Sequence, residues 1–263
     1  MNHLACSLEP GRSLNPCVIL NTNIKNIAVI SDFHGNYPSL KAVTAAAEKL
    51  ACEYYLCCGD YLGYYYEANE VIKLIRTLPH TAILGNHDRD FLTLLDGEWQ
   101  MTEEYKNKYG GSLELAMTDV ERENVHWLRS LPHMLEVAVK DTIILLCHGS
   151  PWDINEYLYP DMAEQKLREI YVLNYDLVIM AHTHYQDVKR NGQQIILNPG
   201  SVGQARDKGG AAAWAMVTIE SNGIDIKLMR TKYEINEVVS QVMALDPEVK
   251  YLYQVLQRGL HGV

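Results

Sequence analysis

Residues that bind metal ions or transfer protons are concentrated in this chain directly after short apolar runs. They are Asp32 and His34 after 26–31, Asp60 after 54–59, Asn86 and His87 after 81–85, His148 after 142–147, and His182 and His184 after 176–181. Apolar runs of this length are typical of buried strands. Because sites in open α/β sheets form at the carboxyl ends of strands, we expect these side chains to converge.

The residue types and their spacing predict a transition-metal site. Asp32 and His34 are two positions apart, as are His182 and His184, and on an extended backbone such residues point to the same side. Carboxylate, amide and imidazole groups suit Mn, Fe, Zn, Co or Ni better than an all-oxygen calcium site. The set is too large for one tetrahedral zinc ion and suits two ions that share a carboxylate.

The elements expected to position these residues alternate between strand and helix in the first part of the chain. Strand-like runs at 26–31, 54–59 and 81–85 are separated by helical patterns at 38–50 and 67–78. This β-α-β-α-β order predicts a parallel core.

The rest of the chain is helical over 88–131, with a break at Gly110-Gly111, and then richer in hairpins. The further elements expected are a hairpin of 134–139 and 142–147 turning at Lys140-Asp141, a helix at 162–173, a strand at 176–181, a hairpin over 187–198 with Asn191-Gly192 at its tip, a hairpin over 212–230 turning at Asn222-Gly223, and a helical tail from Glu234. These elements predict an α/β protein of two mixed sheets packed face to face, with helices outside.

Length and composition are those of a globular protein with one main domain. Of the 263 residues, 48% are hydrophobic and 21% charged. We expect a loose N-terminal extension at 1–25, the main domain at 26–232, and a helical tail at 233–263 that packs on the same domain. The net charge of -10 argues against a stable nucleic-acid partner or a coat on an anionic membrane. A small anionic substrate stays possible, because bound cations reverse the local sign of charge.

The six cysteines include no CxxC pair, and a disulfide framework is not expected at this density. Cys57, Cys58 and Cys147 lie in apolar runs and are predicted to be buried, reduced thiols. No apolar run with a basic leader stands at the start, and no stretch approaches the roughly 18 apolar residues of a membrane helix. A cytoplasmic location is therefore the expectation.

Five ordered motifs resemble the signature of the calcineurin-like metallophosphoesterases. They are Asp32-Phe-His34, Gly59-Asp60-Tyr-Leu-Gly63-Tyr64, Gly85-Asn86-His87-Asp88, His148-Gly149 and His182-Thr-His184. The later Asn198-Pro-Gly-Ser-Val-Gly203 and the run 148–160 resemble the small bacterial and archaeal phosphodiesterases of this superfamily, although Asn198-Pro-Gly-Ser also favours a turn whatever its function. The resemblance spans about residues 26–232 and implies a four-layer α-β-β-α sandwich.

The resemblance also implies a role for each motif residue. One divalent ion would be held by Asp32, His34, Asp60 and His184, and a second by Asp60, Asn86, His148 and His182, with Asp60 bridging. His87 would lie near the leaving oxygen and donate a proton or a hydrogen bond there. Tyr64, Arg206 and Asn86 are candidate substrate contacts, and Arg89 is a second possible phosphate-binding arginine or a surface ion-pair partner.

The implied reaction is hydrolysis of a small phosphate ester. The substrate would be a phosphodiester, or else a phosphomonoester or a dinucleoside polyphosphate, attacked by a hydroxide that bridges two ions such as manganese. His87 would supply the proton that the leaving group needs. Two alternatives stay open: a phosphoprotein phosphatase, and a non-catalytic scaffold with this fold, which would be expected to have lost ligands or His87.

Two positions depart from the family pattern. Ala181 stands where a glycine usually precedes the His-x-His motif, a change that should leave the ligands in place. Tyr64-Tyr65-Tyr66 stands where the small bacterial subgroup often has Tyr-Gly-Pro, so the shape of the substrate mouth does not carry over.

Overall fold

Two mixed β-sheets form the centre of the molecule in the computed structural model, which describes residues 17–220 and 223–258. The five-stranded sheet has the spatial order β11 (Gly223–Thr231), β10 (Ala212–Glu220), β2 (Asn26–Ile30), β3 (Tyr54–Cys57) and β4 (His80–Ala82). The six-stranded sheet has the order β1 (Cys17–Ile19), β5 (Met134–Val139), β6 (Thr142–Cys147), β7 (Leu177–Ile179), β9 (Gln194–Pro199) and β8 (Gln186–Asn191).

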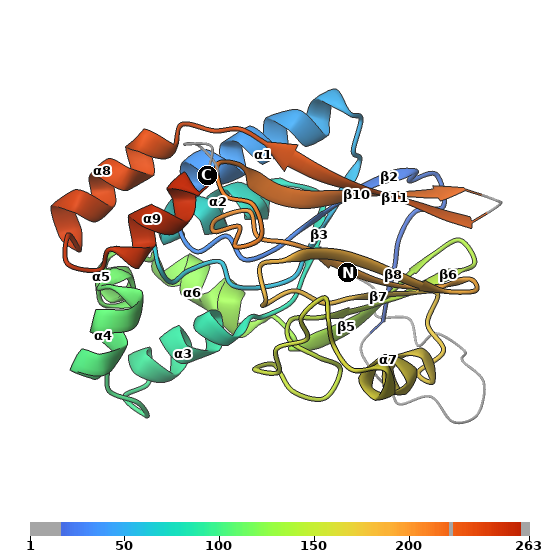
Figure 1. Ribbon diagram of the computed structural model, residues 1–263, viewed down its shortest axis with the longest axis horizontal. Helices are drawn as coiled ribbons and strands as arrows, with labels where there is room; N and C mark the ends of the chain where they lie inside the picture. Colours follow the sequence, from blue (N-terminus) through green and yellow to red (C-terminus); the bar gives the residue numbers. More distant parts are fainter. Residues whose placement is uncertain (1–16, 221–222, 259–263) are drawn as a thin grey trace.

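The helices lie outside the two sheets (Figure 1). They are α1 (Tyr37–Lys49), α2 (Ala68–Thr77), α3 (Asn86–Leu95), α4 (Glu103–Tyr109), α5 (Ser112–Asp119), α6 (Arg122–Arg129), α7 (Glu164–Tyr171), α8 (Ile235–Leu245) and α9 (Tyr251–Gln257). In Figure 1, α1 lies above the five-stranded sheet and α7 below the six-stranded one, while α3 to α6 gather with α8 and α9 at one end. The predicted four-layer α-β-β-α sandwich is confirmed. Within the described ranges, no helix combines the length and the apolar character needed to cross a membrane.

The period of two along each strand divides its side chains between two cores. On β2, Ile27 and Val29 enter the apolar layer between the sheets, whereas Ala28 and Ile30 pack under the helices. The outer face of the six-stranded sheet forms a separate core with α7. Strands buried on both faces read as continuous apolar runs, which is why 26–31 is recognisable in the sequence.

The first three strands of the main domain are parallel. β2 pairs with β3, and β3 with β4, in the predicted β-α-β-α-β order. β3 ends at Cys57 and β4 at Ala82, earlier than expected, because the residues that follow leave the ladder to form site loops. Cys57, Cys58 and Cys147 are buried and free, as predicted.

The expected loose extension contains a strand that the sequence analysis missed. β1 runs parallel to β5, with Cys17 opposite Glu136, and Leu20 N donates to Ala138 O at 2.9 Å. This edge strand has only three residues, and its Ile19 is 56% exposed. It is too short for the apolar pattern of a strand to be recognised in the sequence. Residues 1–16 of that extension lie outside the described residues.

The predicted hairpins are present, but two of them differ from the prediction at the tip. Asn191 pairs with Gln194, so Gly192 and Gln193 form the turn instead of Asn191-Gly192, and Gly192 takes the left-handed conformation at φ 58°. In the β10–β11 hairpin, Gly223 was expected at the tip but is the first residue of β11, where it pairs with Glu220. The expected tip residue Asn222 is outside the described part.

The helical tail is tied to the rest of the molecule by polar contacts as well as by apolar packing. Tyr65 OH donates to the carbonyl of Leu252 on α9 at 2.9 Å. Asp246, directly after α8, accepts hydrogen bonds from Tyr66 OH at 2.6 Å and from Gly111 N at 3.0 Å. The tail is thereby connected to the loop after Asp60 and to the start of α5.

The layer between the sheets should dominate stability. Leu56→Ala removes a fully buried side chain from that layer and should lower the free energy of unfolding by about 2–5 kcal/mol, because a cavity remains. Leu228→Ala, at a position 42% exposed on β11, is the matched control and should change it by about 0.5 kcal/mol or less. Urea unfolding monitored by circular dichroism measures both, and equal effects would contradict this account of the core.

Candidate metal centre

The structure brings the predicted metal-ligand residues and His87 together at one end of the two sheets. Asp32, His34 and Asp60 follow β2 and β3 in the five-stranded sheet, and Asn86 and His87 begin α3 after β4. His148, His182 and His184 follow β6 and β7 in the six-stranded sheet. Except for the half-buried Asn86, all of these residues are buried. Both sheets therefore contribute to one buried polar site.

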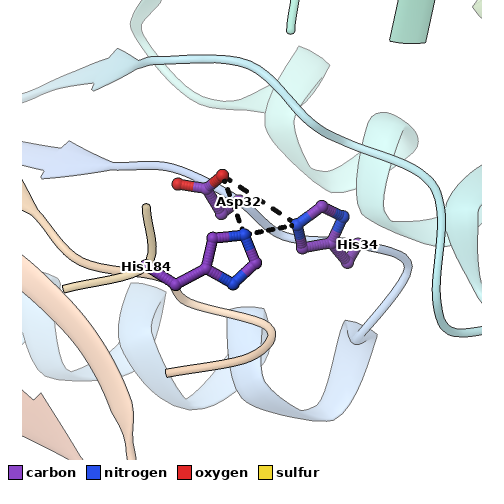
Figure 2. A group of neighbouring side chains, drawn as sticks. All are labelled: Asp32, His34 and His184. Atoms are coloured by element: carbon purple, nitrogen blue, oxygen red, sulfur yellow. Dashed lines mark hydrogen bonds and ion pairs between the residues drawn. The ribbon is translucent and has the colours of Figure 1, made fainter. Parts of the chain in front are cut away.

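A first group of ligand atoms is formed by Asp32, His34 and His184 (Figure 2). His184 Nε2 lies 3.1 Å from His34 Nε2 and 3.3 Å from Asp32 Oδ1. His34 Nε2 lies 3.9 Å from the same carboxylate oxygen. Two imidazole nitrogens and one carboxylate oxygen thus face a common point.

A second group is formed by Asp60, His148 and His182, with Asn86 beside it. His148 Nε2 lies 3.2 Å from Asp60 Oδ2 and 3.0 Å from Asn86 Oδ1. The ligand atoms of Asp60, His148 and His182 all lie within 4.8 Å of one another. This group combines the carboxylate, amide and imidazole donors that suit a transition metal.

Asp60 lies between the two groups. Its Oδ2 is 3.8 Å from His34 Nε2 in the first group and 3.2 Å from His148 Nε2 in the second. Its Oδ1 instead accepts a hydrogen bond from the backbone N–H of His87 at 2.9 Å. One oxygen of this carboxylate is held by the backbone, and the other is shared by both groups.

Three buried atoms of these groups lack a hydrogen-bond partner within the described residues. They are Asp32 Oδ1, Asp60 Oδ2 and His182 Nε2. A buried polar atom without a partner costs stability, so three of them converging on one place call for an explanation. All three can donate a lone pair, and cations would satisfy them together. The residues present therefore fit a site for divalent metal ions.

Backbone carbonyls set the orientation of the histidine rings. The contacts are His34 Nδ1 to Leu62 O at 3.2 Å, His148 Nδ1 to Cys58 O at 2.7 Å, and His184 Nδ1 to Gln204 O at 2.8 Å. An imidazole that donates from Nδ1 keeps the lone pair of Nε2 for a metal. In all three residues it is Nε2 that points into the site.

The local backbone differs from the extended conformation expected for the Asp-x-His and His-x-His pairs. Five candidate ligands are left-handed, with φ of 53° at Asp32, 51° at His34, 60° at Asp60, 65° at His182 and 64° at His184. Residues other than glycine rarely adopt this conformation, and it clusters at functional sites. As a result, neighbours in one motif can serve different groups, as His182 and His184 do.

Asp88 holds this loop geometry in place. Its carboxylate accepts hydrogen bonds from the backbone N–H groups of Asp60, Tyr61 and Gly85, each at 2.8 Å. Within the described structure, no hydrogen bond joins Asp88 to the His87 ring. Asp88 therefore positions the Asp60 loop and does not orient His87. A Cβ at Gly85 would overlap Asp60 Oδ1 and N, which explains the glycine there. The only sequence signal for the role of Asp88 was its place as the last residue of the Gly85-Asn86-His87-Asp88 motif.

The Asn198-Pro-Gly-Ser segment supports two of the metal-site loops. Ser201 Oγ donates to Asp32 O at 2.7 Å, and Gly203 N donates to the same carbonyl at 2.9 Å. Asn198 Nδ2 donates to Ala181 O at 2.9 Å, just before His182. The segment comprises the end of β9 and the start of the loop that follows, instead of a turn, and it supports the site.

Burial and close charges shift the pKa values of the site in opposite directions. Burial raises the pKa of Asp32, but His184 opposes this and brings it to about 2. Burial lowers the pKa of His148, but Asp60 raises it to about 9. Burial, together with His148, lowers the pKa of His182 to about 3. The charge of Asp60 thus favours the protonated form of His148 in the metal-free protein, and a cation bound at Nε2 would displace that proton.

His87 is buried beside the two groups, and its ring centroid is 5.1 Å from that of His34. Tyr105 OH lies 3.4 Å from its Nδ1, and a Cβ at Gly63 would come within 2.8 Å of the same atom. Burial lowers the pKa of His87, although Asp60 partly opposes this. Gly63 thus leaves the space that the His87 ring needs.

Two of the predicted substrate contacts lie next to each other at the mouth of the site. Arg206 Nη2 donates to Tyr64 OH at 2.8 Å, and both side chains line a cavity of about 470 Å³. Arg89 does not line that cavity and instead pairs with Asp90 at 2.9 Å.

Comparison with known proteins agrees with this architecture. The calcineurin-like phosphoesterase superfamily domain matches residues 26–222. An uncharacterized protein of Methanocaldococcus jannaschii is 31% identical over 236 residues, 82% of this chain and 91% of that protein. A metallophosphoesterase from Sphaerobacter thermophilus is 25% identical with a TM-score of 0.69, over 90% of this chain and 100% of that one. A hypothetical protein from Pyrococcus horikoshii OT3 shares the fold at 21% identity and a TM-score of 0.72, over 87% of this chain and 97% of that one.

With candidate ligand groups converging at the ends of its sheets and a family match across most of its length, this chain belongs to the calcineurin-like phosphoesterase superfamily.

Proposed function

We propose that this protein is a dinuclear metal-dependent phosphoesterase that hydrolyses a small phosphodiester. The position of Asp60 Oδ2 carries the proposal. This buried oxygen has no hydrogen-bond partner among the described residues and faces His34 on one side and His148 on the other. A carboxylate oxygen placed in this way suits a ligand shared by two cations.

The proposed ligand sets follow the two groups. One ion would be held by Asp32, His34, Asp60 and His184, and the other by Asp60, Asn86, His148 and His182. Mn, Fe, Zn, Ni and Co all suit these donors. When bound, two such ions offset the negative charge of a phosphate and lower the pKa of water enough to supply a nucleophile at neutral pH.

The remaining residues of the site would bind the substrate and assist the leaving group. The ligand atoms of His87, His34 and Asp60 also lie within 4.8 Å of one another. His87 belongs to neither proposed ligand set, which would leave its ring for a leaving oxygen. Burial lowers the pKa of His87 and so favours its neutral form, whose single N–H can still donate a hydrogen bond, and the negative charge of a bound phosphate would raise that pKa and favour protonation. Arg206 offers its guanidinium to a phosphate oxygen at the cavity wall.

Asp60→Asn should weaken metal binding and remove most of the activity, because a neutral amide cannot hold two cations as a carboxylate does. We expect the wild type to bind two Mn²⁺ ions per chain and the variant fewer, measured by elemental analysis after dialysis alongside hydrolysis of a model diester. Asp225→Asn, on the exposed side of β11, changes charge equally and should leave both readings unchanged. Wild-type metal content and turnover in Asp60→Asn would exclude the bridging role.

His87→Ala should separate catalysis from metal binding. Metal content should stay at the wild-type level, while hydrolysis of an ester with an alkoxide leaving group slows by roughly 10²–10⁴-fold, the usual effect of losing a general acid. A nitrophenyl ester should lose much less, because nitrophenolate leaves without a proton.

The measurement is kcat/KM for both esters, with His126→Ala on the exposed face of α6 as the control. An equal loss on both esters would point to charge stabilisation by His87 in place of proton donation. A loss of metal would mean that His87 is itself a ligand.

A further inference from the structure

The cavity above the metal centre is unusually rich in tyrosine. Its volume is about 470 Å³, and four separate segments of the chain contribute tyrosines to its lining. They are Tyr64 after Asp60, Tyr109 at the end of α4, Tyr157 and Tyr159 in the loop after His148, and Tyr251 at the start of α9. The charged lining residues are mostly cationic: Arg206, Lys108 and Lys250 against Glu248.

Tyrosines adjoin both ligand groups. The ring centroid of Tyr157 is 3.9 Å from that of His182, and that of Tyr64 is 4.5 Å from that of His34. Tyr109 continues this wall outward, with its ring 5.5 Å from Tyr64. A phosphate held at the metal centre would therefore place its substituent among these rings.

Core packing does not account for the outer rings. Tyr157 and Tyr159 are 46% and 40% exposed, and their rings stack in parallel at 5.8 Å. Large exposed aromatic residues grouped at the mouth of a cavity mark a binding surface more often than a structural one. Arg206 forms no ion pair with a carboxylate in the described part of the chain, and its hydrogen bonds go to Tyr64 and Gln204.

The tail closes the far wall of this cavity. Glu248, Val249 and Lys250 lie in the connection between α8 and α9, and Tyr251 begins α9. Asp246, in the same connection, is anchored to Tyr66 OH and Gly111 N. This connection is therefore fixed to the loops that surround the site.

We propose that the cavity binds the substituent of the phosphate ester, that it selects a planar aromatic ring, and that the tail supplies one wall through Tyr251. The inference rests on the proposed phosphoesterase site. Aromatic rings bind one another through stacked or edge-to-face contacts, which typically improve affinity by about three- to tenfold beyond the area they bury. A saturated ring of similar size lacks these contacts. The ring could be attached to the phosphate oxygen, as in an aryl ester, or through a sugar, as in a nucleotide.

Binding of non-hydrolysable phosphonates to the Mn²⁺-loaded protein tests the selection without requiring turnover. Phenylphosphonate is compared with cyclohexylphosphonate, and the methylene phosphonate analogue of adenosine 5′-monophosphate with that of ribose 5-phosphate, by calorimetry. We expect the aromatic member of at least one pair to bind three- to tenfold more tightly. A preference in the first pair alone identifies aryl esters, and one in the second identifies nucleotides.

The Tyr251→Leu variant tests whether the tail supplies one wall of the cavity. It should reduce the preference for the aromatic member to less than twofold, while Tyr253→Leu, a half-buried tyrosine on the same helix that does not line the cavity, should keep it. Unchanged melting temperatures would show that both variants are folded, and Tyr157→Leu offers a second test from the opposite wall.

The outcomes separate the two proposals. Equal binding within both pairs, with metal-dependent binding of all four ligands, would overturn the aromatic selection and leave the phosphoesterase site standing. Metal-independent binding, or no binding of any of the four, would overturn the phosphate site on which the selection depends. A full preference retained in Tyr251→Leu would overturn the role of the tail.

Discussion

The carboxylate of Asp88 is the contact on which the metal centre depends. It accepts backbone hydrogen bonds from Asp60, Tyr61 and Gly85 and so joins the loop after β3 to the start of α3. Burial and the charge of Asp60 raise the pKa of Asp88 to about 7, whereas hydrogen bonds from the backbone favour its charged form. Together with the hydrogen bond from His87 N to Asp60 Oδ1, this anchor fixes Asp60 between the two ligand groups.

The strained loops are stable because rigid elements enclose them. Left-handed residues other than glycine cost on the order of 1–3 kcal/mol each, and five of them occur among the candidate ligands. Parallel strands fix the start of each loop, and the Ser201 and Asn198 side chains fix the carbonyls beside Asp32 and His182. The free energy gained from apolar packing between the sheets thus offsets the cost of a backbone conformation that the loops alone would not adopt.

The sequence predicted the layers and the convergence of the site because both follow from strand ends. Asp32, Asp60 and His148 each stand where an apolar run stops, and the carboxyl ends of parallel strands meet at one edge. Their roles as ligands remain predictions. The bracing by Asp88 and the carbonyl of Gln204 beside His184 could not be foreseen, because hydrogen bonds between a side chain and a distant backbone leave no periodic pattern. The position of the tail depends likewise on tertiary contacts.

Each ligand group draws residues from both sheets, so metal binding depends on the two sheets having packed together. His34 and His184 are 150 positions apart in the chain, and Asn86 and His148 are 62 apart. An unfolded chain cannot offer such donors together, so the ions would be captured only after the two layers have met. Their binding energy would then act as a reversible cross-link between the layers, adding to the free energy of folding in proportion to the logarithm of the free metal concentration. The availability of metal in the surroundings would in this way set how firmly the two halves of the sandwich hold together.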